Sequence, residues 1–304
     1  TFVKAIYEDS QNVLWLGSYG DGLFRFDEQE QVFVPVPLNA ARTEEEEKLD
    51  MLVSDIYEDH RGNFWITTSR TGLIRYDREK GKAVFRPFDE EETVRNSFVK
   101  TIFEDREGEL WVCTEQYGLY RIQPESWDIK HYQNEPGKNS LSNNIVKDIL
   151  QDQEGRIWLA TDGGGVNIFD KKTERFTRYG FDIGEASSLS SNAVYTFFKD
   201  EREIIWIRTF GGGINIFDPN KKPFIHYTQE ENNPNSLSHP AVLSFAEDRN
   251  GIIWIGTDGG GLNRFNPATG RFRHYKHQPS DPSSLSSNAV TSIRIDSRNR
   301  VWVG

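Results

Sequence analysis

The chain of 304 residues contains a single cysteine, Cys113, and a single methionine. One cysteine excludes an internal disulfide and any metal cluster held by several thiolates. The sequence has no apolar run long enough to span a membrane, so we expect no direct membrane contact. The chain opens with Thr1-Phe2-Val3-Lys4, which has the pattern of a strand rather than of a signal peptide.

Positively charged residues are also fewer than negatively charged ones. The chain has 36 Lys and Arg and 47 Asp and Glu, so its net charge is −11. Nucleic-acid binding needs a positive field to displace counterions from phosphates, so we expect no nucleic-acid partner. No Gly-x-Ser-x-Gly nucleophile motif occurs, and no helix follows the Asp-Gly-Gly-Gly runs to receive a phosphate. We therefore predict no catalytic residue, no metal and no cofactor in this chain.

Aromatic residues are abundant at 13% of the chain, and seven of the eight tryptophans recur at intervals of 46 to 50 residues. The seven are Trp15, Trp65, Trp111, Trp158, Trp206, Trp254 and Trp302. An Asp lies six residues before each of them, and a Gly lies seven residues after each of the first six. Three markers kept in register over so many copies indicate an internal repeat. The recurring Asp is interpreted as a turn or capping residue.

Each repeat has the alternation of four short strands separated by hairpin-turn residues, as in Ile253-Trp254-Ile255-Gly256-Thr257. Four antiparallel strands per repeat of this length are typical of a β-propeller blade. We predict an all-β, seven-bladed type of propeller with six complete blades and the first two strands of a seventh. A tandem β-solenoid is the rival architecture. The predicted single domain covers 1–304, with blades at about 1–37, 51–89, 98–133, 145–180, 193–228 and 241–276 and a partial blade at 289–304.

In a propeller, the links between blades and the loops between second and third strands open on one face. The later links share the pattern Ser-Leu-Ser-x-Asn, and their Leu residues (Leu141, Leu189, Leu237, Leu285) are expected to be buried. The loops of several blades instead carry aromatic and charged residues, which suit a polar, ring-shaped ligand such as a sugar. The candidate ligand-binding residues on this face are Tyr19, Asp21, Arg70, Glu115, Tyr117, Arg208, Phe210 and His239.

The repeat resembles the two-component regulator propeller repeat, most closely from Ser140 to Gly304. The resemblance rests on the motif Asn-Ala-Val-x-x-Ile-x-x-Asp-x-x-Asn/Gly-x-x-Trp-x-Gly, followed by Thr-Asp-Gly-Gly-Gly-Leu-Asn-Arg-Phe. It implies a piece of the periplasmic sensor region of a bacterial hybrid two-component sensor histidine kinase, with an oligosaccharide ligand. It also implies an adjoining propeller and immunoglobulin-like domain, a possible homodimer, and a kinase activity that resides in C-terminal domains outside this chain.

Two other functions stay open at this point. The chain could be a structural or interaction propeller whose ligand site lies on another domain. It could also be a propeller lyase or hydrolase acting on a polysaccharide or lactone, for which His239, Arg208 and Tyr117 are the candidate residues.

Overall fold

The computed structural model describes residues 2–38, 52–69, 72–85, 98–124, 126–185, 187–219, 221–230 and 232–304. Every regular element within these ranges is a β-strand. Within the same ranges, no helix has the length and apolar character needed to cross a membrane. The all-β prediction is therefore confirmed for the described chain.

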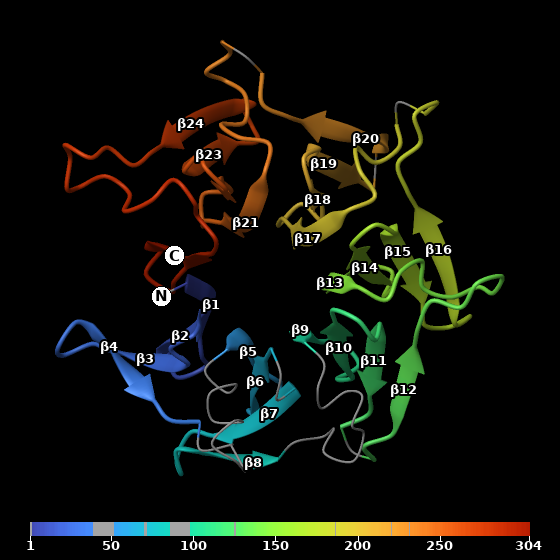
Figure 1. Cartoon of the computed structure of the whole chain (residues 1–304), viewed down its shortest axis with the longest axis horizontal. Coiled ribbons are helices and arrows are strands. Elements are labelled where there is room, and N and C mark those ends of the chain that lie inside the picture. The colour runs from blue at the N-terminus through green and yellow to red at the C-terminus, as the bar shows by residue number, and fades with distance from the viewer. Residues whose placement is uncertain are drawn as a thin grey trace. The chain divides into compact units, whose positions relative to one another are not determined.

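The strands form two compact units, Thr1–Ile149 and Leu150–Gly304, with β13 extending over the boundary between them. In the first unit, four-stranded antiparallel sheets follow one another along the chain, each in strand order (Figure 1). Their strands are β1 (Phe2–Glu8), β2 (Leu14–Tyr19), β3 (Leu23–Asp27) and β4 (Val32–Val36), then β5 (Val53–Glu58), β6 (Phe64–Thr68), β7 (Gly72–Asp77) and β8 (Lys82–Phe85), then β9 (Val99–Glu104), β10 (Leu110–Thr114), β11 (Leu119–Ile122) and β12 (Ile129–Tyr132).

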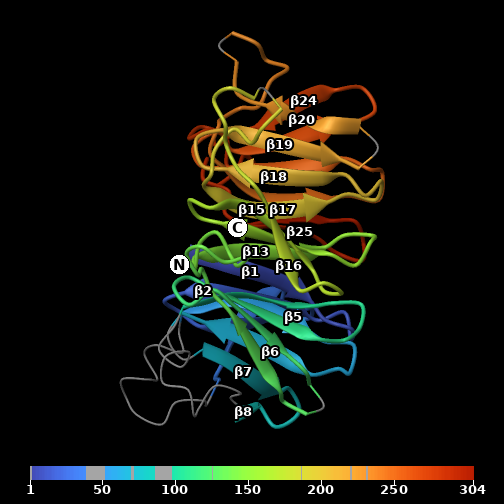
Figure 2. The same ribbon diagram turned by 90° about the vertical axis from the view of Figure 1, so that its right-hand side faces the viewer.

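The second unit continues the same pattern and ends with a two-stranded hairpin. Its sheets comprise β13 (Val146–Gln151), β14 (Ile157–Thr161), β15 (Gly165–Asp170) and β16 (Arg175–Tyr179), then β17 (Val194–Lys199), β18 (Ile205–Thr209), β19 (Gly213–Asp218) and β20 (Lys221–Tyr227), then β21 (Val242–Glu247), β22 (Ile253–Thr257), β23 (Leu262–Asn266), β24 (Arg271–Tyr275), and last β25 (Ile293–Ile295) and β26 (Val301–Val303). Figure 2 shows β17, β18 and β19 side by side in chain order.

Six four-stranded meanders and a final hairpin are the blades of a β-propeller, so the predicted fold class is confirmed. We number the blades one to seven in chain order. The sheets have no solenoid coils, which removes the rival architecture for the described chain. That 1–304 forms one domain stays a prediction.

The Asp and Trp markers of the repeat meet in every blade through the same contacts. In blade four, Asp152 accepts hydrogen bonds from the backbone N–H of Arg156 at 2.9 Å and from the indole Nε1 of Trp158 at 2.8 Å. The turn is closed by Gly155, whose N–H donates to the Asp152 carbonyl at φ +80°. The interpretation of this Asp as a turn residue is confirmed, and the same carboxylate also anchors the buried Trp.

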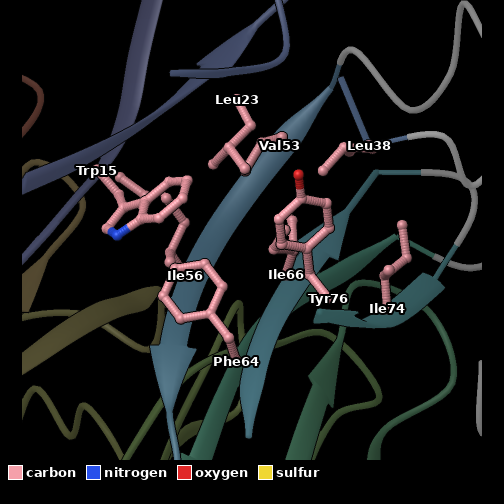
Figure 3. Packing of buried hydrophobic residues seen from close by; sticks show 10 residues of the cluster. Trp15, Leu23, Leu38, Val53, Ile56, Phe64, Ile66, Ile74 and Tyr76 are labelled. Atoms are coloured by element: carbon pink, nitrogen blue, oxygen red, sulfur yellow. The ribbon is translucent and has the colours of Figure 1, made fainter. Parts of the chain in front are cut away.

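Neighbouring blades pack face to face through the apolar side chains of their inner strands. Between blades one and two, Trp15 and Leu23 meet Val53 and Phe64, with the Trp15 and Phe64 rings 4.9 Å apart (Figure 3). Burying each such side chain stabilises the fold by about 1.5–3 kcal/mol. The blade contacts therefore provide the core that one isolated sheet lacks.

The links between blades also contribute to burial. Leu141, Leu189 and Leu237 are fully buried, as predicted. Leu285 is only half-buried, and here the prediction was wrong. The link that holds Leu285 leads to the two-stranded hairpin rather than to a four-stranded sheet, so less apolar surface is present to cover it.

Candidate functional site

The loop that connects β18 and β19 is held in place by hydrogen bonds to its own blade and to the link before β17. The Thr209 hydroxyl donates to the Gly213 carbonyl at 3.3 Å, and the Phe210 N–H donates to the Ala193 carbonyl at 2.9 Å. Gly213 adopts φ +72°, and a Cβ there would lie 2.4 Å from the Tyr227 carbonyl oxygen, so only glycine fits. These bonds fix the loop and leave the Phe210 ring 64% exposed.

Arg208 occupies a position of the repeat at which other blades have small residues. The residue two after the Trp is Gly17, Thr67, Cys113, Ala160 or Gly256 in the other complete blades. At Gly256 even a Cβ would approach the Ser244 hydroxyl to 2.4 Å and the Val290 carbonyl to 2.6 Å. Blade five thus departs from the repeat by accommodating a long cationic side chain where another blade has no room.

The guanidinium of Arg208 lies over an aromatic platform made by two rings. Its central carbon is 4.7 Å from the centroid of the Tyr195 ring. The Tyr195 ring stacks in turn on Phe210, with centroids 5.9 Å apart and planes 28° from parallel. A cation over an aromatic face contributes about 0.5–2 kcal/mol, so this arrangement positions the guanidinium in the free protein.

Tyr195 reaches this place because β17 is irregular. The pairing of β17 with β18 shifts register between Val194 and Thr196, so Tyr195 is an extra residue in the strand. The Tyr195 hydroxyl donates to a carboxylate oxygen of Asp162 at 3.2 Å. Asp162 comes directly after β14, in the neighbouring blade of the same unit. The site therefore combines an arginine, a carboxylate and two rings from adjacent blades.

Burial lowers the pKa of Arg208 to about 10, against the opposing influence of Tyr195 and Asp258. The side chain thus stays charged at neutral pH. Its Nε is buried and has no hydrogen-bond partner among the residues that the structure describes. A buried donor without a partner costs free energy, so a ligand oxygen placed here would recover about 1–3 kcal/mol.

His239 lies beside a second loop of the same unit, Asp258-Gly259-Gly260-Gly261. Its Nδ1 accepts from the Ala241 N–H at 3.2 Å, and its Nε2 would lie 3.7 Å from a Cβ at Gly259. The Asp258 N–H donates to the Ala241 carbonyl at 2.8 Å, which ties this loop to the link that carries His239. The same loop carries Asp258, whose charge opposes the effect of burial on the pKa of Arg208.

Four of the predicted site residues that the structure describes lie in the first unit, and these four do not form a comparable cluster. Tyr19 is 45% exposed at the end of β2, and Asp21 is exposed, with its N–H donating to the Ser18 hydroxyl at 3.0 Å. Glu115 accepts from the Lys147 ammonium at 3.2 Å. Tyr117 packs against the apolar cluster between blades two and three.

Arg70 lies outside the described residues. Within the described ranges, no group of three or more His, Cys, Asp or Glu side chains is placed to hold a metal ion.

Sequence reasoning missed Tyr195 because it searched the loops and links rather than the first strands. It missed Asp162 because the loop Asp162-Gly163-Gly164-Gly165 has the plain pattern of the repeat. A signal was available, because the other described bulges between a first and a second strand place Lys4, Ser54, Lys100 and Leu243 at the corresponding position. An aromatic residue there occurs in blade five alone among these five bulges.

The model of the family described as two component regulator propeller matches six segments of the chain: residues 1–20, 48–70, 93–116, 140–163, 236–259 and 284–304. Among solved structures, the extracellular domain of hybrid two component system BT3049 from B. thetaiotaomicron is 25% identical, with a TM-score of 0.78. The alignment covers all of this chain and 38% of that one. The extracellular domain of hybrid two component system BT4673 from the same organism is 21% identical, with a TM-score of 0.56, over all of this chain and 44% of that one.

A virginiamycin B lyase from Staphylococcus aureus is similar in fold, with 14% identity and a TM-score of 0.67 over all of this chain and 92% of that one. At this identity the likeness concerns the fold only. The search of curated proteins found no relative of the chain. The chain thus spans well under two thirds of the sensor domains that it resembles in sequence and structure.

Proposed function

Because this chain is built of two-component regulator propeller repeats and belongs to that family, we propose that it is a ligand-sensing part of the periplasmic region of a bacterial sensor kinase. We further propose that the cluster of Arg208, Tyr195, Phe210 and Asp162 binds an oligosaccharide. One observation carries the second proposal. Blade five replaces a small residue of the repeat by an arginine that has a buried, unpartnered Nε above an aromatic platform.

The chemistry of this cluster suits a sugar ring. The exposed face of Phe210 offers a flat apolar surface to the C–H groups of a pyranose. Arg208 supplies N–H donors and Asp162 supplies a carboxylate acceptor, which together suit neighbouring hydroxyl groups. Small-molecule sites usually combine such an apolar wall with a few well-placed polar groups.

Charge favours an uncharged sugar over an acidic one. The cation Arg208 is accompanied by Asp162, which accepts from Tyr195, and by the charge of Asp258. An acidic ligand would meet two like charges for one opposite charge, whereas hydroxyl groups can donate to both carboxylates. The proposed ligand is therefore a neutral oligosaccharide.

Binding would be transmitted as a population shift, in which the ligand favours one docking arrangement of this propeller over another. The partners proposed for that step are the adjoining propeller and immunoglobulin-like domains of the parent sensor, or a second copy in a homodimer. Such a shift requires differential contacts of the ligand in the two arrangements, and the exposed platform at the loop end of blade five offers a surface for them.

A thermal-shift screen of this chain against neutral and acidic oligosaccharides, with release of reducing ends assayed in the same wells, tests the proposal. We expect stabilisation by a neutral oligosaccharide without release of new reducing ends. Stabilisation by none of the sugars would contradict a saccharide site here and favour a scaffold propeller. Release of reducing ends that His239→Ala abolishes would instead identify a hydrolase or lyase.

A further inference from the structure

A cavity of about 420 Å³ lies in the first unit, between blades one and two. It opens at the turns that join β1 to β2, β5 to β6 and β7 to β8, which is the end of these blades opposite their β2–β3 and β6–β7 loops. The residues that matter for its chemistry are Val13, Trp15, Arg25, Phe64, Arg75 and Arg78.

The corresponding cavity between blades four and five is far smaller, with a volume of about 20 Å³. Counting from the repeated Trp, blade four has Arg156 where blade one has Val13, and Ile168 where blade one has Arg25. The Arg156 side chain fills the space by bonding to Asp152, with 2.7 Å between Nε and the carboxylate oxygen. The cavity between blades one and two is thus a local departure from the repeat rather than a property of the fold.

Blade three shows how the repeat neutralises an arginine at this position. Arg121, the equivalent of Arg25, forms a two-pronged ion pair with Glu109 at 2.7 and 2.9 Å. In blade one the equivalent of Glu109 is Val13, which offers no acceptor. Arg25 is an exposed residue that lines this cavity, and within the part of the chain that the structure describes its side chain has no hydrogen bond or ion pair. Its charge lowers the pKa of nearby Asp27 and also acts on Tyr76.

The other charges around the cavity are compensated or exposed. Arg78 pairs with Asp9 at 2.9 Å and with Glu58 at 2.5 Å. Asp77 bonds the Lys80 ammonium at 2.8 Å and also the Lys80 backbone N–H at 2.9 Å. Glu79 is an exposed carboxylate at the edge of the cavity. Arg75 reaches the Asn63 side-chain oxygen at 3.5 Å, so an amide takes the place that a carboxylate holds in blade three.

We propose that this inter-blade cavity is a second ligand site, separate from Arg208, and that it binds a small organic carboxylate. The guanidinium of Arg25 takes the ligand carboxylate in place of the missing glutamate, because an arginine fork matches a carboxylate in geometry and charge. Val13 borders the remaining space with an apolar side chain, and the volume is large enough for a carbon skeleton beyond the acid group.

The test uses saturation-transfer NMR and calorimetric titration of this chain with D-glucuronate, D-glucose and inorganic sulfate. Two variants copy blade four: Arg25→Ile removes the cation, and Val13→Arg fills the cavity. Arg271→Ala, which removes an exposed arginine of blade six, is the matched control. Thermal unfolding of each variant establishes that it is folded.

We expect glucuronate to bind the chain and the control, glucose not to bind this cavity, and both blade-four variants to weaken glucuronate binding at least about tenfold. Three results would overturn the proposal: no binding of glucuronate to the unmodified chain, binding by both variants as tight as that of the unmodified chain, or sulfate binding as tightly as glucuronate. Because the proposed ligand of Arg208 is neutral, these results are independent of the outcome of the oligosaccharide screen.

Discussion

The guanidinium of Arg208 rests on the ring of Tyr195, 4.7 Å from its centroid, and the same ring stacks on the exposed Phe210. Two residues that depart from the repeat, one in β18 and one at the bulge of β17, thereby build a single surface. Structural positions of a propeller recur from blade to blade, as the Asp–Trp pairs do. A cluster that occurs in one blade and leaves a buried donor without a partner points to a ligand.

The first prediction concerns Phe210→Ala. Because this ring is 64% exposed, its removal leaves no cavity, and the free energy of unfolding should change by less than about 0.5 kcal/mol. Oligosaccharide binding should weaken about tenfold or more, since an aromatic anchor is lost from the centre of the site. Titration calorimetry measures this, with Phe181→Ala, a ring that is 49% exposed on a link, as the control. Equal losses in both variants would argue against a specific role for Phe210.

Asp105→Ala should destabilise the fold by about 3 kcal/mol, because it removes a buried acceptor that serves several donors. Asp105 accepts from the Glu107 N–H at 3.1 Å, the Glu109 N–H at 3.0 Å and the Trp111 indole at 2.9 Å. Chemical denaturation monitored by tryptophan fluorescence measures the change. Asp281→Ala, at an exposed Asp, should cost less than about 0.5 kcal/mol. A loss that is no larger for Asp105 would show that the Asp–Trp pair is dispensable.

A third prediction compares two glycines of positive φ. At Gly165 (φ +74°) a Cβ would lie 2.1 Å from the Tyr179 carbonyl oxygen, whereas at Gly137 (φ +81°) it would meet nothing within 4 Å. Gly137→Ala should cost about 1–2 kcal/mol from backbone strain alone. Gly165→Ala should cost at least about 2 kcal/mol more, because the added atom collides with backbone. Equal unfolding free energies in urea for the two variants would contradict the close approach at Gly165.

Asp55 gives a pH-dependent prediction. Part of the residue is exposed, but its carboxyl is withdrawn from solvent among Thr101, Ile56 and Ile102, and this burial raises its pKa to about 6. The folded state then holds the proton more tightly than the unfolded state, whose pKa is near the ordinary value. Stability contributed by this group is fully present below about pH 4 and is lost as the pH rises to about 6.

Asp55→Asn should remove this dependence. The variant should gain up to about 3 kcal/mol relative to the unmodified chain between pH 4 and pH 7, as judged from urea denaturation at each pH. Asp21→Asn, which makes the same substitution at an exposed residue, is the control. A profile of Asp55→Asn that runs parallel to the original would show that Asp55 ionises normally in the fold.

The sequence was sufficient to predict the fold because the blade is specified locally. The Asp six residues before each Trp bonds both the turn amides and the indole, so their spacing is fixed by one set of contacts. Because each strand pairs with the next one along the chain, no pairing between strands that are distant in the sequence has to be predicted. Leu285 shows where this reasoning fails, since its burial depends on the size of the sheet that follows rather than on its own link.

The candidate site could be predicted only in part. Arg208, Phe210 and His239 were predicted from loop and strand-end variation, and the structure places all three around the loops of the second unit. Tyr195 was missed because a bulge cannot be recognised from alternation alone. The cavity beside Arg25 was missed for another reason. That cavity depends on Val13, which occupies the position where blade three has Glu109. Glu109 supplies a carboxylate partner to the arginine of its blade, and Val13 does not.

The most direct test of the central claim is calorimetric titration of the neutral oligosaccharide found in the screen into the unmodified chain, Arg208→Ala and Arg271→Ala. The account predicts that Arg208→Ala loses at least about tenfold in affinity, while the control, which removes an exposed arginine of the same unit, binds as the unmodified chain does. Equal affinities for Arg208→Ala and the control would contradict a binding site at blade five.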